Sequence, residues 1–207
     1  MYKEIYSQYA SKTRKEILRL RSEINDAERT YLEGSRRMYM RKRFYPDANS
    51  TLRVAYGSVE DYYPRDGDYY NWKTTGEGIL EKKDNSDPEF TVPEKLETLI
   101  RARDFGVYGE NDTLPVCFIH TNDQTGGSSG SPVMNGNGEL IGISFDGNWE
   151  SMSGDIAYDP SYKRSIATDI RYVLFIIDKF AGAGHLIEEM TIVKEETSAS
   201  VTESSAP

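Results

Sequence analysis

Cysteine, histidine and long apolar runs are all scarce in this chain of 207 residues. The single cysteine, Cys117, excludes a disulfide within the chain and the common zinc patterns. Because it lies in the apolar run Val116–Ile119, we expect a buried core thiol and not a catalytic one. The longest apolar run, Tyr172–Ile177, is much too short to span a bilayer. The composition therefore predicts no metal site, no membrane span and no internal disulfide.

Basic residues are also fewer than acidic ones. The chain has 25 Lys and Arg against 34 Asp and Glu, which gives a net charge of −9. Nucleic-acid binding needs clustered Lys and Arg. The one basic cluster, Arg36 to Arg43, lies in a helical stretch and is interpreted as a solvated face. Nucleic acid is therefore not an expected partner. The start of the chain, Met1–Glu4, opens directly into a charged helical pattern without the apolar segment of a signal peptide.

The amino-terminal segment, residues 3–42, predicts one long helix. Apolar residues recur there at steps of three and four, as an amphipathic helix requires. They are Ile17, Leu20, Ile24, Ala27 and Tyr31. Such a stripe is a packing seam, so we expect a partner helix to cover it.

The rest of the chain is predicted to be β-rich, with two helices and a polar tail. Short β-type runs such as Leu52–Tyr56 and turns such as Pro64–Gly67 fill residues 44–168, interrupted by a helix predicted from Pro93 to about Asp104. A closing helix is predicted over residues 169–180, ending before Gly182. Its apolar face would consist of Ile170, Val173, Leu174 and Ile177. The tail, residues 194–207, is polar and of low complexity, which predicts disorder.

The stretch Thr125–Val133 is the most informative part of the chain, because it contains the pattern Gly-x-Ser-Gly-x-Pro. Gly127 permits a tight turn that points two amides into one hole, with Ser129 exposed at the tip. The turn Asn135–Gly138 between two apolar runs predicts that the loop leads into a buried hairpin. The same pattern also occurs in plain turns, and Ser131 is a rival nucleophile.

Several longer strings identify a family. From about residue 43 to residue 193, the chain resembles the carboxy-terminal part of the bacterial dipeptidyl-peptidase 7 and dipeptidyl-peptidase 11 family of serine peptidases. The matching strings are Arg43–Thr51, the serine loop Thr125–Val133, Phe145–Glu150, Asp169–Lys179 and Glu189–Val193. The resemblance implies a mainly β fold with helices. Residues 43–193 would form the C-terminal β-barrel part of a chymotrypsin-like double β-barrel, and residues 1–42 the terminal helix of an inserted α-helical domain.

The resemblance also implies roles for individual residues. Ser129 would be the nucleophile, and the amides of Gly127 and Ser129 the oxyanion hole. Ser128 stands where the family usually has Asn, which we expect to tune the loop only modestly. Asp146 would bind the α-amine of the peptide, and Gly147 would line the pocket for the residue before the cut. Family members specific for acidic side chains carry Arg at the latter position, so glycine implies a hydrophobic preference. The alternative is that the pair forms a simple Asp-Gly turn.

This prediction does not identify a catalytic base. The chain has only two histidines, His120 and His185, and neither matches the family's catalytic position. We expect both to be ordinary surface or strand-end residues. In the family, the catalytic His and Asp lie in an amino-terminal lobe. A dyad of His120 and Ser129 is an alternative.

Two functional hypotheses follow. In the first, the chain is a piece of a dipeptidyl-peptidase that removes dipeptides from free peptide N-termini through an acyl-enzyme and lacks the catalytic His and Asp. Its partners would be such peptides, the amino-terminal lobe and a second copy in a homodimer, in the periplasm or at the cell surface, without a cofactor. In the second, it is a catalytically silent remnant that binds peptides or a partner.

Overall fold

The computed structural model describes residues 2–41, 52–154 and 157–193. The chain divides into two compact units, Met1–Asn49 and Ser50–Pro207. The expected boundary after residue 42, the string Arg43–Thr51 and the tail predicted to be disordered lie outside the described residues.

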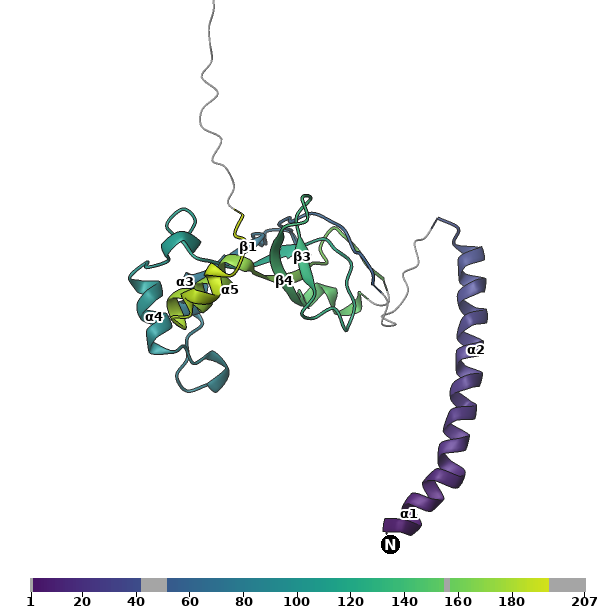
Figure 1. The fold of residues 1–207 in the computed structure, drawn as a ribbon. Coiled ribbons are helices and arrows are strands. Elements are labelled where there is room, and N and C mark those ends of the chain that lie inside the picture. The colour runs from purple at the N-terminus through teal and green to yellow at the C-terminus, as the bar shows by residue number, and fades with distance from the viewer. Residues whose placement is uncertain (1, 42–51, 155–156, 194–207) are drawn as a thin grey trace, which may run out of the picture. The chain divides into compact units, whose positions relative to one another are not determined.

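The first unit is a single helical rod (Figure 1). It consists of α1 (Tyr2–Gln8), a π-helical segment (Tyr9–Thr13) and α2 (Arg14–Met38), so the predicted helix ends four residues early. No residue of these three helical segments is buried, and the predicted apolar stripe is exposed from Ile17, at 37%, to Tyr31, at 77%. Within the helical rod itself, nothing in the described residues covers this stripe.

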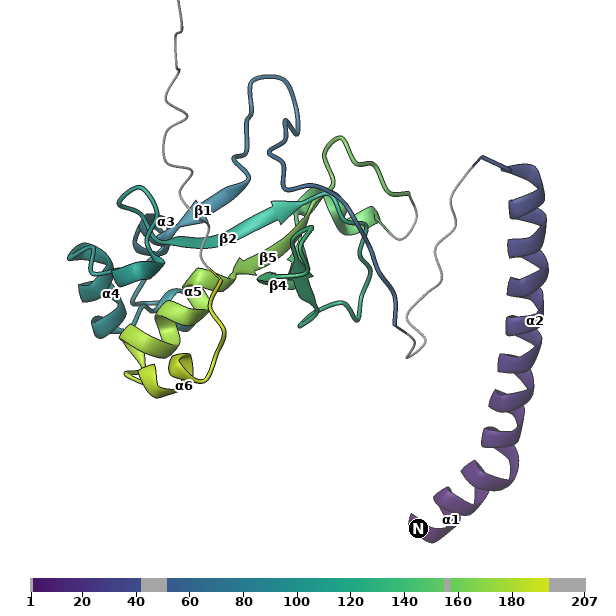
Figure 2. The same ribbon diagram turned by 45° about the horizontal axis from the view of Figure 1, so that its top comes forward.

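The second unit is built on a five-stranded antiparallel sheet in the order β1-β2-β5-β4-β3 (Figure 2). Its strands are β1 (Lys73–Thr75), β2 (Pro115–His120), β3 (Pro132–Met134), β4 (Leu140–Gly147) and β5 (Ser165–Asp169). The order places β1 and β3 at the two edges of the sheet. The antiparallel sheet and the long amino-terminal helix are thus confirmed, but the described fold is mixed α/β and not mainly β, because its strands are short and helices pack against them. Closure into a barrel and the double-barrel arrangement stay predictions.

The hairpin that follows the serine loop is confirmed, but it is not buried as predicted. β3 pairs with β4 across the expected Asn135–Gly138 turn. Since β3 is an edge strand, Met134 is 56% exposed. The run Leu52–Tyr56 forms no strand among its described residues, and Leu52 is 95% exposed. Its β-type composition was therefore misleading, and the first bridge after it among the described residues joins Val59, beyond the run, to His120. The turn Pro64–Gly67 is confirmed.

Helices gather at one end of the sheet (Figure 2). They are α3 (Gly76–Glu81), α4 (Glu94–Arg101), α5 (Ile170–Phe175) with its π-helical continuation (Ile176–Phe180), and α6 (Gly184–Glu188). Short 3₁₀ helices occur at Pro88–Phe90, Gly106–Tyr108 and Trp149–Ser153. The core of this end consists of Leu96, Ile100, Phe105, Tyr108, Leu114, Leu174 and Phe175.

The closing helix is confirmed in position, and its predicted apolar face is confirmed in part, since Leu174 lies in the core and Ile170 packs against it. Asp169 caps its start, and Gly182, with φ +68°, follows its end. Phe175 is fully buried against Phe105, although the predicted face omits it. The segment is apolar almost throughout, so its periodicity could not decide which side faces the core. The predicted Val173 and Ile177 do not join the core cluster.

Candidate active site

The serine loop is a pair of tight turns that glycines make possible. Gly127 has φ +96° and Gly130 has φ +85°, a region that residues with a side chain rarely adopt. The amide of Ser128 donates to the carbonyl of Thr125 at 3.2 Å, and the amide of Ser131 donates to the carbonyl of Ser128 at 3.0 Å. The chain therefore reverses direction around Ser129.

Strand β4 holds this loop in place. The amide of Gly130 donates to the carbonyl of Ser144 at 2.8 Å, and the amide of Ser144 donates to the carbonyl of Ser131 at 2.9 Å. The hydroxyl of Ser144, which is buried, donates to Oε1 of Gln124 at 2.5 Å on the incoming side of the loop. Both ends of the loop are thus tied to one buried residue of the sheet.

Ser129 is the exposed tip of the loop, whereas Ser131 is half-buried and belongs to its anchor. The Oγ of Ser129 donates to the carbonyl of Phe145 at 3.1 Å. Phe145 sits at a bulge in β4, where the pairing with β5 shifts between Ser144 and Asp146. Bulges re-aim the side chains beside them, and this one lies directly under Ser129.

The amides of Gly127 and Ser129 are not used in the hydrogen bonds that hold the loop. The amides of Gly127 and Ser129 donate to none of the residues that the structure describes, while those of Ser128 and Gly130 between and after them are paired. Unpaired amides of alternate residues beside an exposed hydroxyl are the elements of an oxyanion hole. Such an arrangement can stabilise negative charge on an atom bonded to Ser129.

Asp146 and Gly147 follow the bulge directly. Asp146 is exposed, and its Oδ1 accepts a hydrogen bond of 2.8 Å from the amide of Gly147. Gly147 ends β4, pairs with Ser165 and is half-buried. The pair lies on strand β4 at its end and not at the centre of a free turn. The second oxygen of Asp146 has no partner among the described residues and is free to bind a cation.

The two histidines differ in environment, and neither is hydrogen-bonded to Ser129 in the described part of the chain. His120 ends β2, which confirms the expectation of a strand-end residue, and it is only 1% exposed. Its ring nitrogens have no hydrogen-bond partner among the described residues. Burial lowers the pKa of His120, and Asn122 opposes this effect. His185 is exposed in α6, as expected.

Cys117 is half-buried in β2, less deeply than predicted. Burial raises the pKa of its thiol, which favours the unreactive protonated form. Across the described ranges, no three His, Cys, Asp or Glu side chains gather so as to hold a metal ion. Nor does any helix in those ranges have the length and apolar character needed to cross a membrane.

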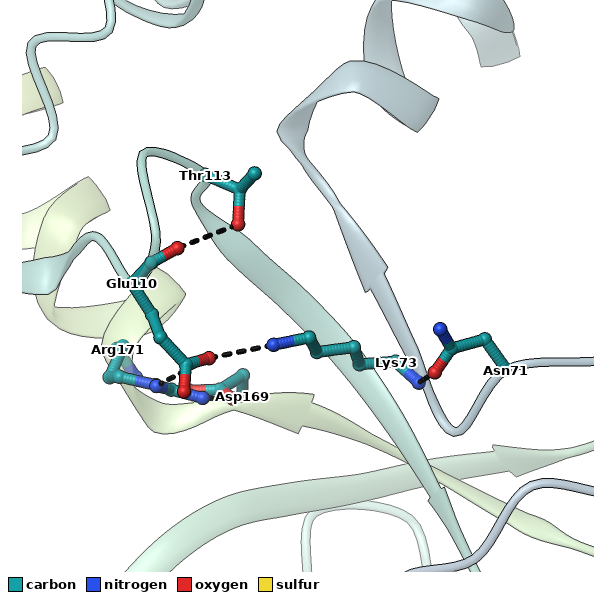
Figure 3. Close-up of polar contacts among 6 residues, drawn as sticks. All are labelled: Asn71, Lys73, Glu110, Thr113, Asp169 and Arg171. Carbon is teal, nitrogen blue, oxygen red and sulfur yellow. Dashed lines mark hydrogen bonds and ion pairs between the residues drawn. The ribbon is translucent and has the colours of Figure 1, made fainter.

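An ionic cluster at the helical end was not predicted (Figure 3). Nζ of Lys73 lies 2.7 Å from Oε2 of Glu110, which Arg171 approaches at 3.4 Å. Arg171 also makes two bonds, of 2.9 and 2.8 Å, to the buried carboxylate of Asp169. Lys73 lowers the pKa of Glu110, and Asp169 raises that of Arg171. The cluster ties β1 to the start of α5 and does not contact the serine loop.

Sequence reasoning also missed the residues that support the site. They are Gln124 and Ser144, which anchor the loop, and Ser151, whose hydroxyl lies against Gly147. No local pattern marks them, because each acts through a residue elsewhere in the chain. Only the position of Ser144, inside a predicted strand next to the loop, hinted at a supporting role.

Comparison with known proteins gives consistent matches. A family model described as Peptidase S46 matches residues 1–192. The chain is 58% identical over 167 residues to a dipeptidyl-peptidase 7 of Phocaeicola vulgatus, covering 80% of this chain and 23% of that protein. It is 54% identical over 170 residues to an Asp/Glu-specific dipeptidyl-peptidase of Flavobacterium psychrophilum, covering 82% of this chain and 24% of the relative.

A solved structure matches as well. The crystal structure of Porphyromonas endodontalis DPP11 in complex with the dipeptide Arg-Glu superimposes with a TM-score of 0.76 at 47% identity, covering 84% of this chain and 25% of that one. The chain therefore spans about a quarter of the length of these relatives.

Proposed function

The chain belongs to the peptidase S46 family, and on this premise we propose that it carries the nucleophile half of a serine dipeptidyl aminopeptidase. Its relatives are dipeptidyl-peptidases. The observation that carries the proposal is the exposed Ser129 on a loop with two unpaired amides, those of Gly127 and Ser129 itself.

In the proposed reaction, Oγ of Ser129 attacks the scissile carbonyl of the peptide. Its proton passes to a base and then to the leaving amine, while the two amides stabilise the oxyanion. Water hydrolyses the resulting acyl-enzyme and releases a dipeptide. Neither the buried His120 nor the exposed His185 is hydrogen-bonded to Ser129 in the described part of the chain, where the hydroxyl donates to Phe145. We therefore assign the base to an amino-terminal lobe.

Selectivity for free N-termini is assigned to Asp146. Its exposed carboxylate has one oxygen available, one residue beyond the bulge that contacts Ser129. An α-amine bound there would make a charge-assisted hydrogen bond, which an acetylated peptide cannot make. Gly147 adds neither bulk nor charge, which supports a hydrophobic preference for the residue before the cut. Homodimerisation and a location in the periplasm or at the cell surface belong to the same proposal.

The test is complementation. The 207-residue chain is mixed with the amino-terminal lobe of the Phocaeicola vulgatus relative, and hydrolysis of a chromogenic dipeptidyl substrate is measured. We expect activity that neither part shows alone, that Ser129→Ala abolishes and that Ser131→Ala retains. Activity that survives Ser129→Ala would overturn the assignment of the nucleophile.

The competing hypothesis is a catalytically silent, peptide-binding remnant. The observation that favours it is the Ser129 hydroxyl, which donates to the carbonyl of Phe145 and to no base in the described part of the chain. It predicts that the mixture stays inactive while the chain still binds a peptide with a free N-terminus. The activity of the mixture distinguishes the two, and isothermal titration with a dipeptide, for the wild type and for Asp146→Asn, tests the binding.

A further inference from the structure

Oγ of Ser151 occupies the space that a side chain at position 147 would need. The backbone of Gly147 is not in the left-handed region, so an L-residue would not be strained there by its φ angle. A Cβ at this position would collide with Oγ of Ser151. The next nearest atoms, Cβ of Ser151 and the carbonyl oxygen of Arg164, would both be 3.4 Å away, at ordinary contact distance. The obstacle is therefore the Ser151 hydroxyl alone.

Hydrogen bonds to Asn148 fix the position of the Ser151 hydroxyl. Ser151 lies in the 3₁₀ helix Trp149–Ser153, and both its amide and its Oγ donate to the carbonyl of Asn148, at 2.9 and 2.7 Å. Asn148 is itself buried. Its Oδ1 accepts from the amide of Arg164 at 2.9 Å, and its Nδ2 donates to the carbonyl of Tyr162 at 2.8 Å. The hydroxyl therefore rests on a fixed, hydrogen-bonded support.

We propose that Ser151 is a specificity-determining residue, because its hydroxyl occupies the space that a side chain at position 147 needs. This proposal rests on the function proposed above, since it takes Gly147 as part of the pocket for the residue before the cut. With Ser151 present, the pocket cannot acquire a cationic side chain from position 147, and peptides with an acidic residue before the cut gain no partner there.

The geometry makes the two positions interdependent. Ser151→Ala removes the colliding atom and leaves Cβ at 3.4 Å, which is sufficient for alanine at position 147. Ser151→Gly removes Cβ as well and gives room for a longer side chain. A change of preference toward acidic residues therefore requires Gly147→Arg together with Ser151→Gly, and neither substitution alone produces it.

The first experiment compares four forms of the full-length product of the gene: wild type, Gly147→Arg, Ser151→Gly and the double variant. kcat/KM is measured for dipeptidyl substrates with leucine or aspartate before the cut. We expect the double variant to raise the aspartate-to-leucine ratio at least about tenfold over either single variant, the effect of one charge-assisted bond. Gly147→Arg alone should lose activity toward both substrates. A full change of preference by Gly147→Arg alone would overturn the proposal.

A second experiment is independent of catalysis. The effect of Gly147→Ala on thermal unfolding of the same protein is measured twice, once with Ser151 intact and once combined with Ser151→Ala. We expect Gly147→Ala to lower Tm by about 4 °C when Ser151 is intact and by less than half of that in the Ser151→Ala background. Equal falls in Tm in the two backgrounds would show that Ser151 does not obstruct position 147. A wild type that hydrolyses neither substrate but shows the unequal falls would instead refute the proposed function and leave the contact between positions 147 and 151 established.

Discussion

The hydroxyl of Ser129 donates a 3.1 Å hydrogen bond to the carbonyl of Phe145, at the bulge of β4. The bond joins the tip of the serine loop to the strand that carries Asp146 and Gly147. It also means that the hydroxyl proton points to a backbone oxygen and not to a base. A base that activates Ser129 must therefore draw the hydroxyl away from Phe145.

Replacement of Ser129 by alanine is expected to reduce kcat of the complemented enzyme by at least about a thousandfold, because no other group forms the acyl-enzyme. The side chain is exposed and makes one hydrogen bond, so the free energy of unfolding should change by no more than about 1 kcal/mol. Steady-state kinetics and urea unfolding measure the two effects. Ser131→Ala is the matched control and should keep most of the activity. The reverse pattern would identify Ser131 as the nucleophile.

Asp146→Asn should weaken selection for a free amine. Loss of a charge-assisted hydrogen bond corresponds to a fall of about 10- to 100-fold in kcat/KM for a free dipeptidyl substrate. Hydrolysis of the acetylated substrate should not fall in parallel. Asp66→Asn removes the same charge from an exposed turn and serves as the control. An equal loss on both substrates would indicate that Asp146 only shapes the turn.

His120 should make the fold sensitive to mild acid. Its folded-state pKa is lowered by burial, so the unfolded chain takes up a proton first as the pH falls through about 6.5. Stability should therefore decrease below that pH, by at most about 1.4 kcal/mol for each pH unit, until the folded-state pKa is passed. His120→Gln should flatten this dependence in urea unfolding between about pH 7.5 and 5. His185→Gln, at an exposed site, is the control and should keep the wild-type pH dependence. If His120→Gln keeps it as well, other groups cause the dependence of stability on pH.

Asp169 should stabilise the helical end in two separable ways. Its Oδ1 caps α5 by accepting from the amide of Arg171 at 2.9 Å, and both oxygens bind the guanidinium. Asp169→Asn keeps the cap and loses the charge, whereas Asp169→Ala loses both. We expect alanine to cost about 1 kcal/mol more than asparagine in the free energy of unfolding, the usual value of a cap. Glu188→Gln, at an exposed site in α6, is the control. Equal costs would mean that the cap contributes nothing.

Local signals in the sequence were sufficient for several elements of the fold. The Asn135–Gly138 turn predicted the β3–β4 hairpin, and Gly182 marked the end of the closing helix. Gly127 predicted a tight loop with Ser129 exposed. Each of these signals acts within a few residues, because a turn or a cap is decided by the φ angles that its own residues can adopt.

What the tertiary structure decided involves residues that are distant in the sequence. Leu52–Tyr56 forms no strand among its described residues, although its composition suits one. Burial of His120, the bulge under Ser129 and the cluster of Glu110 with Arg171 arise only when β2, β4 and β5 are brought together.

The sequence by itself determined the family, the serine loop and the glycine at position 147. Whether a side chain could stand at that position was decided by the Ser151 hydroxyl, which the Asn148 carbonyl holds in place. A sequence pattern specifies which atoms are present and how the local backbone can turn. Packing specifies which atoms compete for the same space, and this competition gives the candidate pocket its shape.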